Sequence, residues 1–240
     1  MTNDFTITNL IKRVNHFFVL LISIAGYVPK NATIFRTIAF FSSIIFAFYI
    51  GRYQSGNSDL AILYFLLSEV CYLSFIAIVL SENGLRHWFI RRWGNENEGY
   101  LTYEAVLGFL FFHNAASIGY IASSSPGSLF HFIPDDFLLI IVVILFISGF
   151  VVKIWAAKVV EIEIYYWKDM FLGKKISNFV VTGPYKYFNN PMYGIGQFTT
   201  YATAIWYGSK YGLIAAFLNQ LLIFLFFYLV EKKFIKRVYQ

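Results

Sequence analysis

Charged residues are scarce in this sequence: they make up 13% of its 240 residues, whereas hydrophobic residues make up 58%. A soluble domain of this size would carry about 25% charged residues. The shortage excludes an ordinary water-soluble fold and indicates an integral membrane protein. The net charge of +6 is no sign of a nucleic-acid partner, because the basic residues are confined to segments beside apolar runs.

Several other features are missing. The single cysteine, Cys71, lies within an apolar run, which excludes an intrachain disulfide. The histidines have no spacing typical of metal ligands, so we expect no metal site. No Gly-x-Gly-x-x-Gly motif follows a strand, and no segment is rich in strand residues, which argues against a Rossmann domain. Residues 1–4 lack the basic segment of a signal peptide, so we expect no cleaved leader.

Long apolar runs dominate what is present. Each approaches the ~20 residues that cross ~30 Å of hydrocarbon. They predict an all-α integral membrane protein with about seven transmembrane helices, the last two forming a hairpin through a turn near 207–209. The predicted spans are 10–28, 34–51, 59–80, 104–122, 137–157, 191–207 and 210–230.

Lysine and arginine are distributed unequally between the two ends of these spans. With seven spans, four basic residues fall on one face of the bilayer and fourteen on the other. Because basic loops remain on the cytoplasmic side, we expect the N-terminus outside. The C-terminus and the loop 158–190 are then expected in the cytoplasm.

Two polar features lie inside the predicted spans. Lys153 lies about one turn from the cytoplasmic end of its span, so its ammonium is expected to extend to the interface. His113 and Asn114 are adjacent polar residues, which we expect to hold helices together by hydrogen bonds. Other ionisable residues are rare in mid-span, which argues against a transporter, although a scaffold or transporter stays open as the alternative outside catalysis.

The segment Gly183–Gly196 lies between the last long apolar runs. Asn190 followed by Pro191 is typical of a helix start, since Asn caps free N–H groups and Pro suits the first helical position. Gly183-Pro184 is typical of a turn. We therefore expect an open helix N-terminus, able to bind an anion, close to the acid Glu231 that ends the last span.

The residues of this region resemble a known family. Asn190-Pro191-Met192-Tyr193, then a short helix, a long apolar helix and a basic tail ending in Val238-Tyr239-Gln240, resemble the phosphatidylethanolamine N-methyltransferases. More broadly, they are similar to the isoprenylcysteine carboxyl methyltransferase superfamily of membrane enzymes. The resemblance covers residues ~150–240. It implies S-adenosylmethionine as the cofactor and a membrane phospholipid as the substrate.

The resemblance also implies two parts of the chain. Residues 1–100 would be N-terminal transmembrane helices of unassigned role. Residues 101–240 would be the methyltransferase core, with its cofactor site at 158–196 and 228–237 and facing the cytoplasm. Residues carried over as cofactor-binding are Gly183, Pro184, Tyr185, Asn190, Pro191, Tyr193 and Glu231.

The chain also departs from the family pattern. Glu231 matches the first acid of a terminal Glu pair, but the second position is Lys232. Asn189-Asn190 stand where the carboxyl methyltransferases have Arg-His, which favours the phospholipid branch. The Gly-x-Gly that the lipid enzymes carry in the preceding span has no counterpart near 159–163.

The physical chemistry of the residues suggests further roles. Gly194 and Gly196 would allow the cofactor to approach the backbone closely. The rings of Tyr185, Tyr187 and Tyr193 suit stacking on adenine or contact with the sulfonium. The lipid phosphate is expected to contact the lysines Lys174, Lys175 and Lys186.

The ammonium of an ethanolamine headgroup, with a pKa of ~10, must lose a proton before it can be methylated. The expected catalytic residues are Glu231, Tyr193, Glu161 and Glu163, the last two forming a wall of the site. The sequence leaves the proton acceptor open among Glu161, Glu163, Asp169, Glu231 and the lipid phosphate. It also leaves open carboxyl methylation of a prenylated cysteine and an NADPH-dependent reductase like the sterol reductases.

Overall fold

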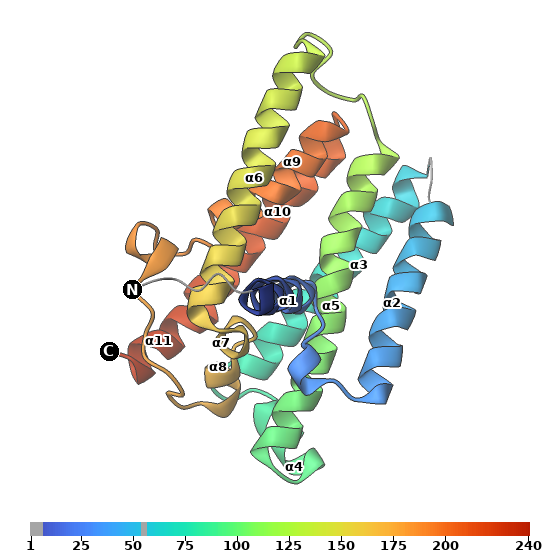
Figure 1. Ribbon diagram of the computed structural model, residues 1–240. Coiled ribbons are helices and arrows are strands. Elements are labelled where there is room, and N and C mark those ends of the chain that lie inside the picture. Colours follow the sequence, from blue (N-terminus) through green and yellow to red (C-terminus); the bar gives the residue numbers. More distant parts are fainter. Residues whose placement is uncertain (1–6, 54–56) are drawn as a thin grey trace, which may run out of the picture.

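The computed structural model describes residues 7–53 and 57–240, in which all regular structure is helical (Figure 1). The expected all-α fold is confirmed for this part of the chain. Residues 1–4, on which the expectation about a leader rests, lie outside it. In chain order the elements are α1 (Ile7–Ile24), η1 (Pro29–Asn31), α2 (Ile34–Tyr53), α3 (Ser58–Leu80), α4 (Arg86–Trp93), α5 (Glu96–Ser124), α6 (Asp135–Val160), α7 (Ile162–Tyr165), α8 (Lys168–Leu172), η2 (Gly183–Lys186), η3 (Ile195–Gln197), α9 (Phe198–Trp206), α10 (Lys210–Phe226), η4 (Phe227–Glu231) and α11 (Lys232–Val238).

Five of the described helical stretches are long and apolar enough to cross a membrane. They are Ile34–Arg52, Ser58–Leu80, Glu96–Ser124, Asp135–Val160 and the continuous stretch Lys210–Val238. Their outward sides carry large apolar side chains, such as Ile144 on α6, which is 61% exposed. Apolar faces of this extent are stable against lipid rather than water. The chain is therefore an integral membrane protein.

The count of seven spans is not confirmed. The first predicted span corresponds to α1, which Figure 1 shows nearly end-on where the long helices run along the page. The helix carries Lys12, Arg13 and His16 among apolar residues, and an amphipathic helix of this kind suits the membrane interface. The sixth predicted span, 191–207, contains the short 3-10 helix η3 and one α-helix, the nine-residue α9, which is ~14 Å long.

The position of α1 also corrects the predicted division of basic residues between the two faces of the bilayer. Lys12 and Arg13 line one surface groove together with Lys158, near the end of α6. The prediction placed these two residues on the opposite face of the bilayer. Lys12 and Arg13 thus join Lys158 at the basic end of the bundle rather than lying at the opposite end.

The predicted hairpin of the last two helices is present. α9 and α10 lie side by side and are joined by a turn at 207–209 (Figure 1). The Ser209 hydroxyl accepts a hydrogen bond from the Gly212 N–H at 2.9 Å and so caps α10. A Cβ at Gly212 would lie 2.8 Å from that of Ala122 and 3.1 Å from that of Ala204. Glycine is therefore needed where α5, α9 and α10 meet.

A buried polar cluster joins three long helices. The Asn114 side chain on α5 donates to Glu69 Oε2 on α3 at 2.7 Å, and the Asn219 side chain on α10 donates to the same oxygen at 3.0 Å. Asn219 also donates to Asn114 Oδ1 at 2.9 Å. His113 Nδ1 lies 2.5 Å from the Tyr64 hydroxyl on α3. The expected role of His113 and Asn114 in joining helices is confirmed.

An aromatic core holds the short helix α8 against the bundle. Phe171 is fully buried and stacks on Tyr103 of α5, with ring centroids 4.9 Å apart. Phe89 of α4 meets the ring of Phe171 edge-on, with the two ring centroids 6.3 Å apart. These contacts fix the segment that carries Trp167 and Asp169, both of which belong to the cavity described below.

The polar cluster generates a stability prediction. Asn219→Ala removes a donor to Glu69 and to Asn114, and interhelical hydrogen bonds in membranes contribute about 1 kcal/mol. We expect the free energy of unfolding in detergent micelles to fall by about this amount. Leu221→Ala, which truncates a half-exposed side chain on the same helix, serves as the control. Equal losses for the two variants would contradict the assigned role of the cluster.

Candidate active site

The chain does not begin an α-helix at Asn190. Residues 191–194 form a turn, η3 follows, and α9 starts only at Phe198. Gly194 has φ −84° and ψ −102°, outside the helical region, and glycine is a weak helix former. The carbonyls of Tyr193 and Gly194 instead accept hydrogen bonds from the Gln220 side chain at 2.9 and 3.2 Å. The predicted open helix N-terminus at this position is therefore wrong.

This interruption directs Tyr193 toward the last helix. The Tyr193 hydroxyl donates to Glu231 Oε2 at 2.7 Å, and the Trp167 side chain also forms a hydrogen bond with this carboxylate. Glu231 closes the π-helical turn η4. Such turns insert one residue into a helix and are frequent at functional sites. The expected convergence of the signature and the terminal acid is confirmed.

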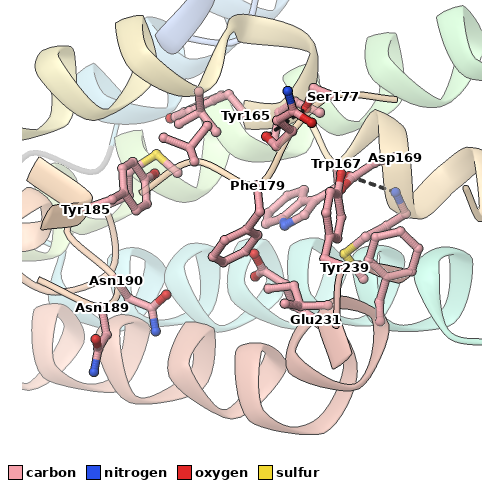
Figure 2. A pocket seen from close by; sticks show the side chains of 18 of the residues that line it. Tyr165, Trp167, Asp169, Ser177, Phe179, Tyr185, Asn189, Asn190, Glu231 and Tyr239 are labelled. Carbon is pink, nitrogen blue, oxygen red and sulfur yellow. Dashed lines mark hydrogen bonds between the residues drawn. The ribbon is translucent and has the colours of Figure 1, made fainter. Parts of the chain in front are cut away.

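Tyr193 and Glu231 line a cavity of about 800 Å³, part of which is open to solvent. Figure 2 shows Trp167, Phe179 and Glu231 grouped within it. Asp169 and Glu231 are the charged side chains on its walls, and no described basic residue lines it. The aromatic side chains on its walls are Tyr165, Trp167, Phe179, Tyr185, Tyr193, Phe234 and Tyr239.

Tyr185 presents an unused hydroxyl to the site. Its oxygen is buried and, among the described residues, has no hydrogen-bond partner. Burial raises the pKa of Tyr185, so the hydroxyl stays protonated and can donate. Gly183, two residues before Tyr185, shapes the turn that carries this side chain. It has φ +61°, and a Cβ there would lie 2.8 Å from the Val159 side chain on α6. An orphaned buried donor of this kind indicates a missing partner such as a ligand.

Asp169 contributes the second carboxylate. Trp167, two residues before it, precedes the start of α8. Its φ of +53° places Trp167 in the left-handed region. The Met170 N–H donates to Asp169 Oδ1 at 2.8 Å, and the Tyr239 hydroxyl donates to Oδ2 at 3.0 Å. Burial nevertheless raises the pKa of Asp169. Burial also raises the pKa of Tyr239, to about 12.

The two other predicted acids lie outside the cavity. Glu161 is exposed at the break after α6, where its φ is +68°. Glu163 forms ion pairs with Lys30 and Lys168, both at 2.8 Å. Burial alone would raise the pKa of Glu163, but the hydrogen bonds and charges of the two lysines lower it overall. The expectation that Glu161 and Glu163 form a wall of the site is therefore corrected.

The predicted glycines and prolines shape the chain around the cavity. Gly194 and Gly196 do not line it, in contrast to the expectation that a ligand would approach them. A Cβ at Gly196 would lie 3.2 Å from the Pro191 carbonyl oxygen and 3.7 Å from the Cβ of Lys153. Pro184 and Pro191 are fully buried. These residues bring protein segments together, whereas Asn190 does line the cavity.

The predicted lysines lie at the surface around the site. Lys174 pairs with Glu96 at 2.5 Å. The ammonium of Lys175 lies 5.8 Å from the ring centroid of Tyr239, and that of Lys186 lies 5.9 Å from that of Tyr187. None of the three lines the cavity. Tyr187 is 68% exposed and does not line it either.

Sequence reasoning missed two residues that contact the carboxylates. No sequence signal connects Trp167 with Glu231. Tyr239 could have been found, because Glu231, Ile235 and Tyr239 recur at the four-residue spacing of one helix face.

Comparison with known proteins finds similarity in this region. Residues 137–240 match the phospholipid methyltransferase family. A phosphatidylethanolamine N-methyltransferase of Eremothecium gossypii is 35% identical over 88 residues, which are 37% of this chain and 10% of that protein. The protein of the same name from Kluyveromyces lactis is 36% identical over 88 residues, again 37% of this chain and 10% of that protein.

The chain spans about a tenth of the length of these two curated relatives. No solved structure matches it. The family match includes every described residue that lines the cavity, from Val160 to Tyr239. The part of the chain that builds the candidate active site, residues 137–240, is therefore the part that is similar to the phospholipid methyltransferase family.

Proposed function

We propose that this protein transfers a methyl group from S-adenosylmethionine to the amine of a membrane phospholipid, namely phosphatidylethanolamine and its methylated derivatives. The observation that carries the proposal is the hydrogen bond between Tyr193 and Glu231, at 2.7 Å. It joins the signature segment to the terminal acid inside one cavity and inside the matched region. The name of the two relatives supports the choice of acceptor over a cysteine carboxylate or a reductase substrate.

The residues of the cavity fit the cofactor. When bound, S-adenosylmethionine supplies a methyl group on a positively charged sulfur. The carboxylates of Glu231 and Asp169 and the surrounding rings favour cationic groups in a cavity whose described walls carry no cation. Glu231 would bind the ammonium of the cofactor, and the Tyr185 hydroxyl and the Asn190 amide would donate hydrogen bonds. Gly183, Pro184 and Pro191 would act indirectly, by shaping the two turns.

Tyr193 and Trp167 hold the Glu231 carboxylate in one orientation. A fixed carboxylate fixes its ligand, and methyl transfer depends on holding the reacting atoms about 3–3.5 Å apart and in line. Phe179, Phe234 and Tyr239 cover the cavity with apolar surface and so limit the access of water. The catalytic contribution of Tyr193 is therefore one of positioning.

Asp169 is the acid best placed to accept the proton of the lipid ammonium. It lines the cavity, whereas Glu161 and Glu163 do not. Burial raises its pKa, which brings its basicity closer to that of the ammonium, with a pKa of ~10. The hydrogen bond from Tyr239 fixes the carboxylate for this transfer.

We infer that the basic end of the bundle faces the cytoplasm, because basic segments remain on that side. The start of α1 and the end of α11 would then lie on the same side, in contrast to the expected external N-terminus. Lys174, Lys175 and Lys186 surround the cavity at this end and would attract the lipid phosphate. Residues 101–240 would form the catalytic core, since every described lining residue lies within them.

The proposal predicts that Glu231→Gln weakens cofactor binding strongly. Loss of one partner of a buried charge pair costs about 2 kcal/mol or more, which is about 30-fold in affinity. Tyr193→Phe removes one hydrogen bond to a charged group and should weaken binding about tenfold. Equilibrium binding of S-adenosylhomocysteine to purified protein in nanodiscs measures both effects. Transfer of labelled methyl groups to a panel of phospholipids tests the reaction itself.

Glu161→Gln is the matched control, because this exposed carboxylate lies outside the cavity. It should leave cofactor affinity and methyl transfer at wild-type levels. A wild-type protein that binds no S-adenosylhomocysteine and methylates none of the lipids would overturn the proposed function.

The role of Asp169 predicts a particular pH dependence. The carboxylate must be ionised to accept a proton, and its pKa is raised, so kcat/KM should fall on acidification at a pH above the ordinary aspartate value of ~3.9. The Tyr239 hydroxyl stabilises the ionised form and so lowers the pKa against the effect of burial. Tyr239→Phe should therefore shift the acidic limb to higher pH. Asp169→Asn should lower kcat by about 10²-fold or more.

The pH profile of kcat/KM for the three proteins measures this prediction. Tyr211→Phe serves as the control, since this tyrosine is exposed at the opposite end of the bundle. An acidic limb that Tyr239→Phe leaves in place would assign the proton acceptor to another group.

A further inference from the structure

A second chamber of about 470 Å³ adjoins the candidate active site. Tyr165, Trp167, Met192 and Tyr193 line both spaces and therefore lie between them. The remaining walls of the chamber come from the long helices α3, α5, α6 and α10, together with Tyr166 and Gln197. The chamber thus extends the site from the basic end into the centre of the bundle.

Lys153 provides the charge of this chamber. Its ammonium lies 5.7 Å from the ring centroid of Phe111 on α5, so the side chain turns into the bundle. The expectation that it extends to the interface is therefore not met. Lys153 lies seven residues before the end of α6, which is ~10 Å along the helix. Within the described part of the chain, no carboxylate lies within 4.0 Å of its ammonium.

The backbone around Lys153 is held firmly. Gly196 packs directly on it, since a Cβ at this glycine would lie 3.9 Å from the Cα of Lys153. One turn earlier on α6, a Cβ at Gly149 would lie 2.7 Å from the backbone nitrogen of Thr199. The lysine therefore projects from a fixed point at the contact between α6 and the signature segment.

The two spaces carry opposite charges. The described walls of the main cavity hold two carboxylates and no cation, and Lys153 is the one charged residue on the described walls of the chamber. Inside the bundle, an ammonium with no counter-ion beside it is unfavourable, so this arrangement calls for an anionic ligand group. Both proposed ligands supply an oxyanion, which is the carboxylate of S-adenosylmethionine or the phosphate of the phospholipid.

We propose that Lys153 binds the oxyanion of a ligand whose cationic part lies beside Glu231 and Asp169. This inference rests on the proposed function and adds a binding residue that the signature segment does not contain. It also assigns the second chamber to the same active site, as the place where the anionic end of the ligand is held.

The test compares Lys153→Met with Lys158→Met, which removes a lysine on the same helix outside both spaces. The two sources of the oxyanion are distinguished with S-adenosylhomocysteine and with 5′-methylthioadenosine, which lacks the carboxylate. If Lys153 binds the carboxylate, Lys153→Met should weaken S-adenosylhomocysteine about tenfold or more and leave 5′-methylthioadenosine unchanged. If it binds the phosphate, cofactor affinity should be unchanged and KM for the phospholipid should rise about tenfold or more.

Lys153→Arg keeps the positive charge and should retain most of the binding in either case. Thermal unfolding of each variant shows whether it is folded, and Lys153→Gln replaces the methionine variant if that one is not. The inference is overturned if the wild type binds and methylates while Lys153→Met matches Lys158→Met in both measurements, and the proposed function then stands. A wild type that binds no S-adenosylhomocysteine overturns both.

Discussion

The candidate site depends on how this chain accommodates a carboxylate at the end of its last long helix. An ionised group removed from water is stable only when hydrogen bonds satisfy it. Glu231 obtains them from Tyr193 and Trp167, which belong to two segments that precede the last helical hairpin. One side chain therefore requires three parts of the chain to meet at one point. The cavity is the space that remains between them.

These parts meet because the helices are interrupted at defined residues. Trp167 is in the left-handed region, where a residue other than glycine costs about 1–3 kcal/mol. Gly194 leaves the helical region, and η4 inserts an extra residue before Glu231. The aromatic packing of Phe171 and the hydrogen bonds from Gln220 hold two of these interruptions in place. The regular helices supply the frame, and their breaks position the functional groups.

The sequence predicted the frame and the location of the site better than its local geometry. Apolar runs identified α3, α5, α6 and α10 because membrane helices must be long and apolar. The apolar run at α1 misled the count of spans. Its length was counted, but the position of the charged residues Lys12 and Arg13 on the helix was not taken into account. Asn190-Pro191 is a typical helix start, yet Gly194 and the carbonyl contacts of Gln220 favour a turn. The contact of Trp167 with Glu231 is tertiary, and nothing local encodes it.

Charges of opposite sign are kept apart in this protein, and their separation makes each available to a ligand. A lysine within reach of Glu231 or Asp169 would form a buried ion pair, and such a pair would occupy the groups that the site needs. Tyr165, Trp167, Met192 and Tyr193 lie between the two spaces and prevent that pairing. A zwitterionic ligand that spans both spaces would satisfy the carboxylates and the ammonium at once. Under the proposed function, the same wall that keeps these groups from pairing would favour a ligand that carries both an anionic and a cationic group, as S-adenosylmethionine and phosphatidylethanolamine do.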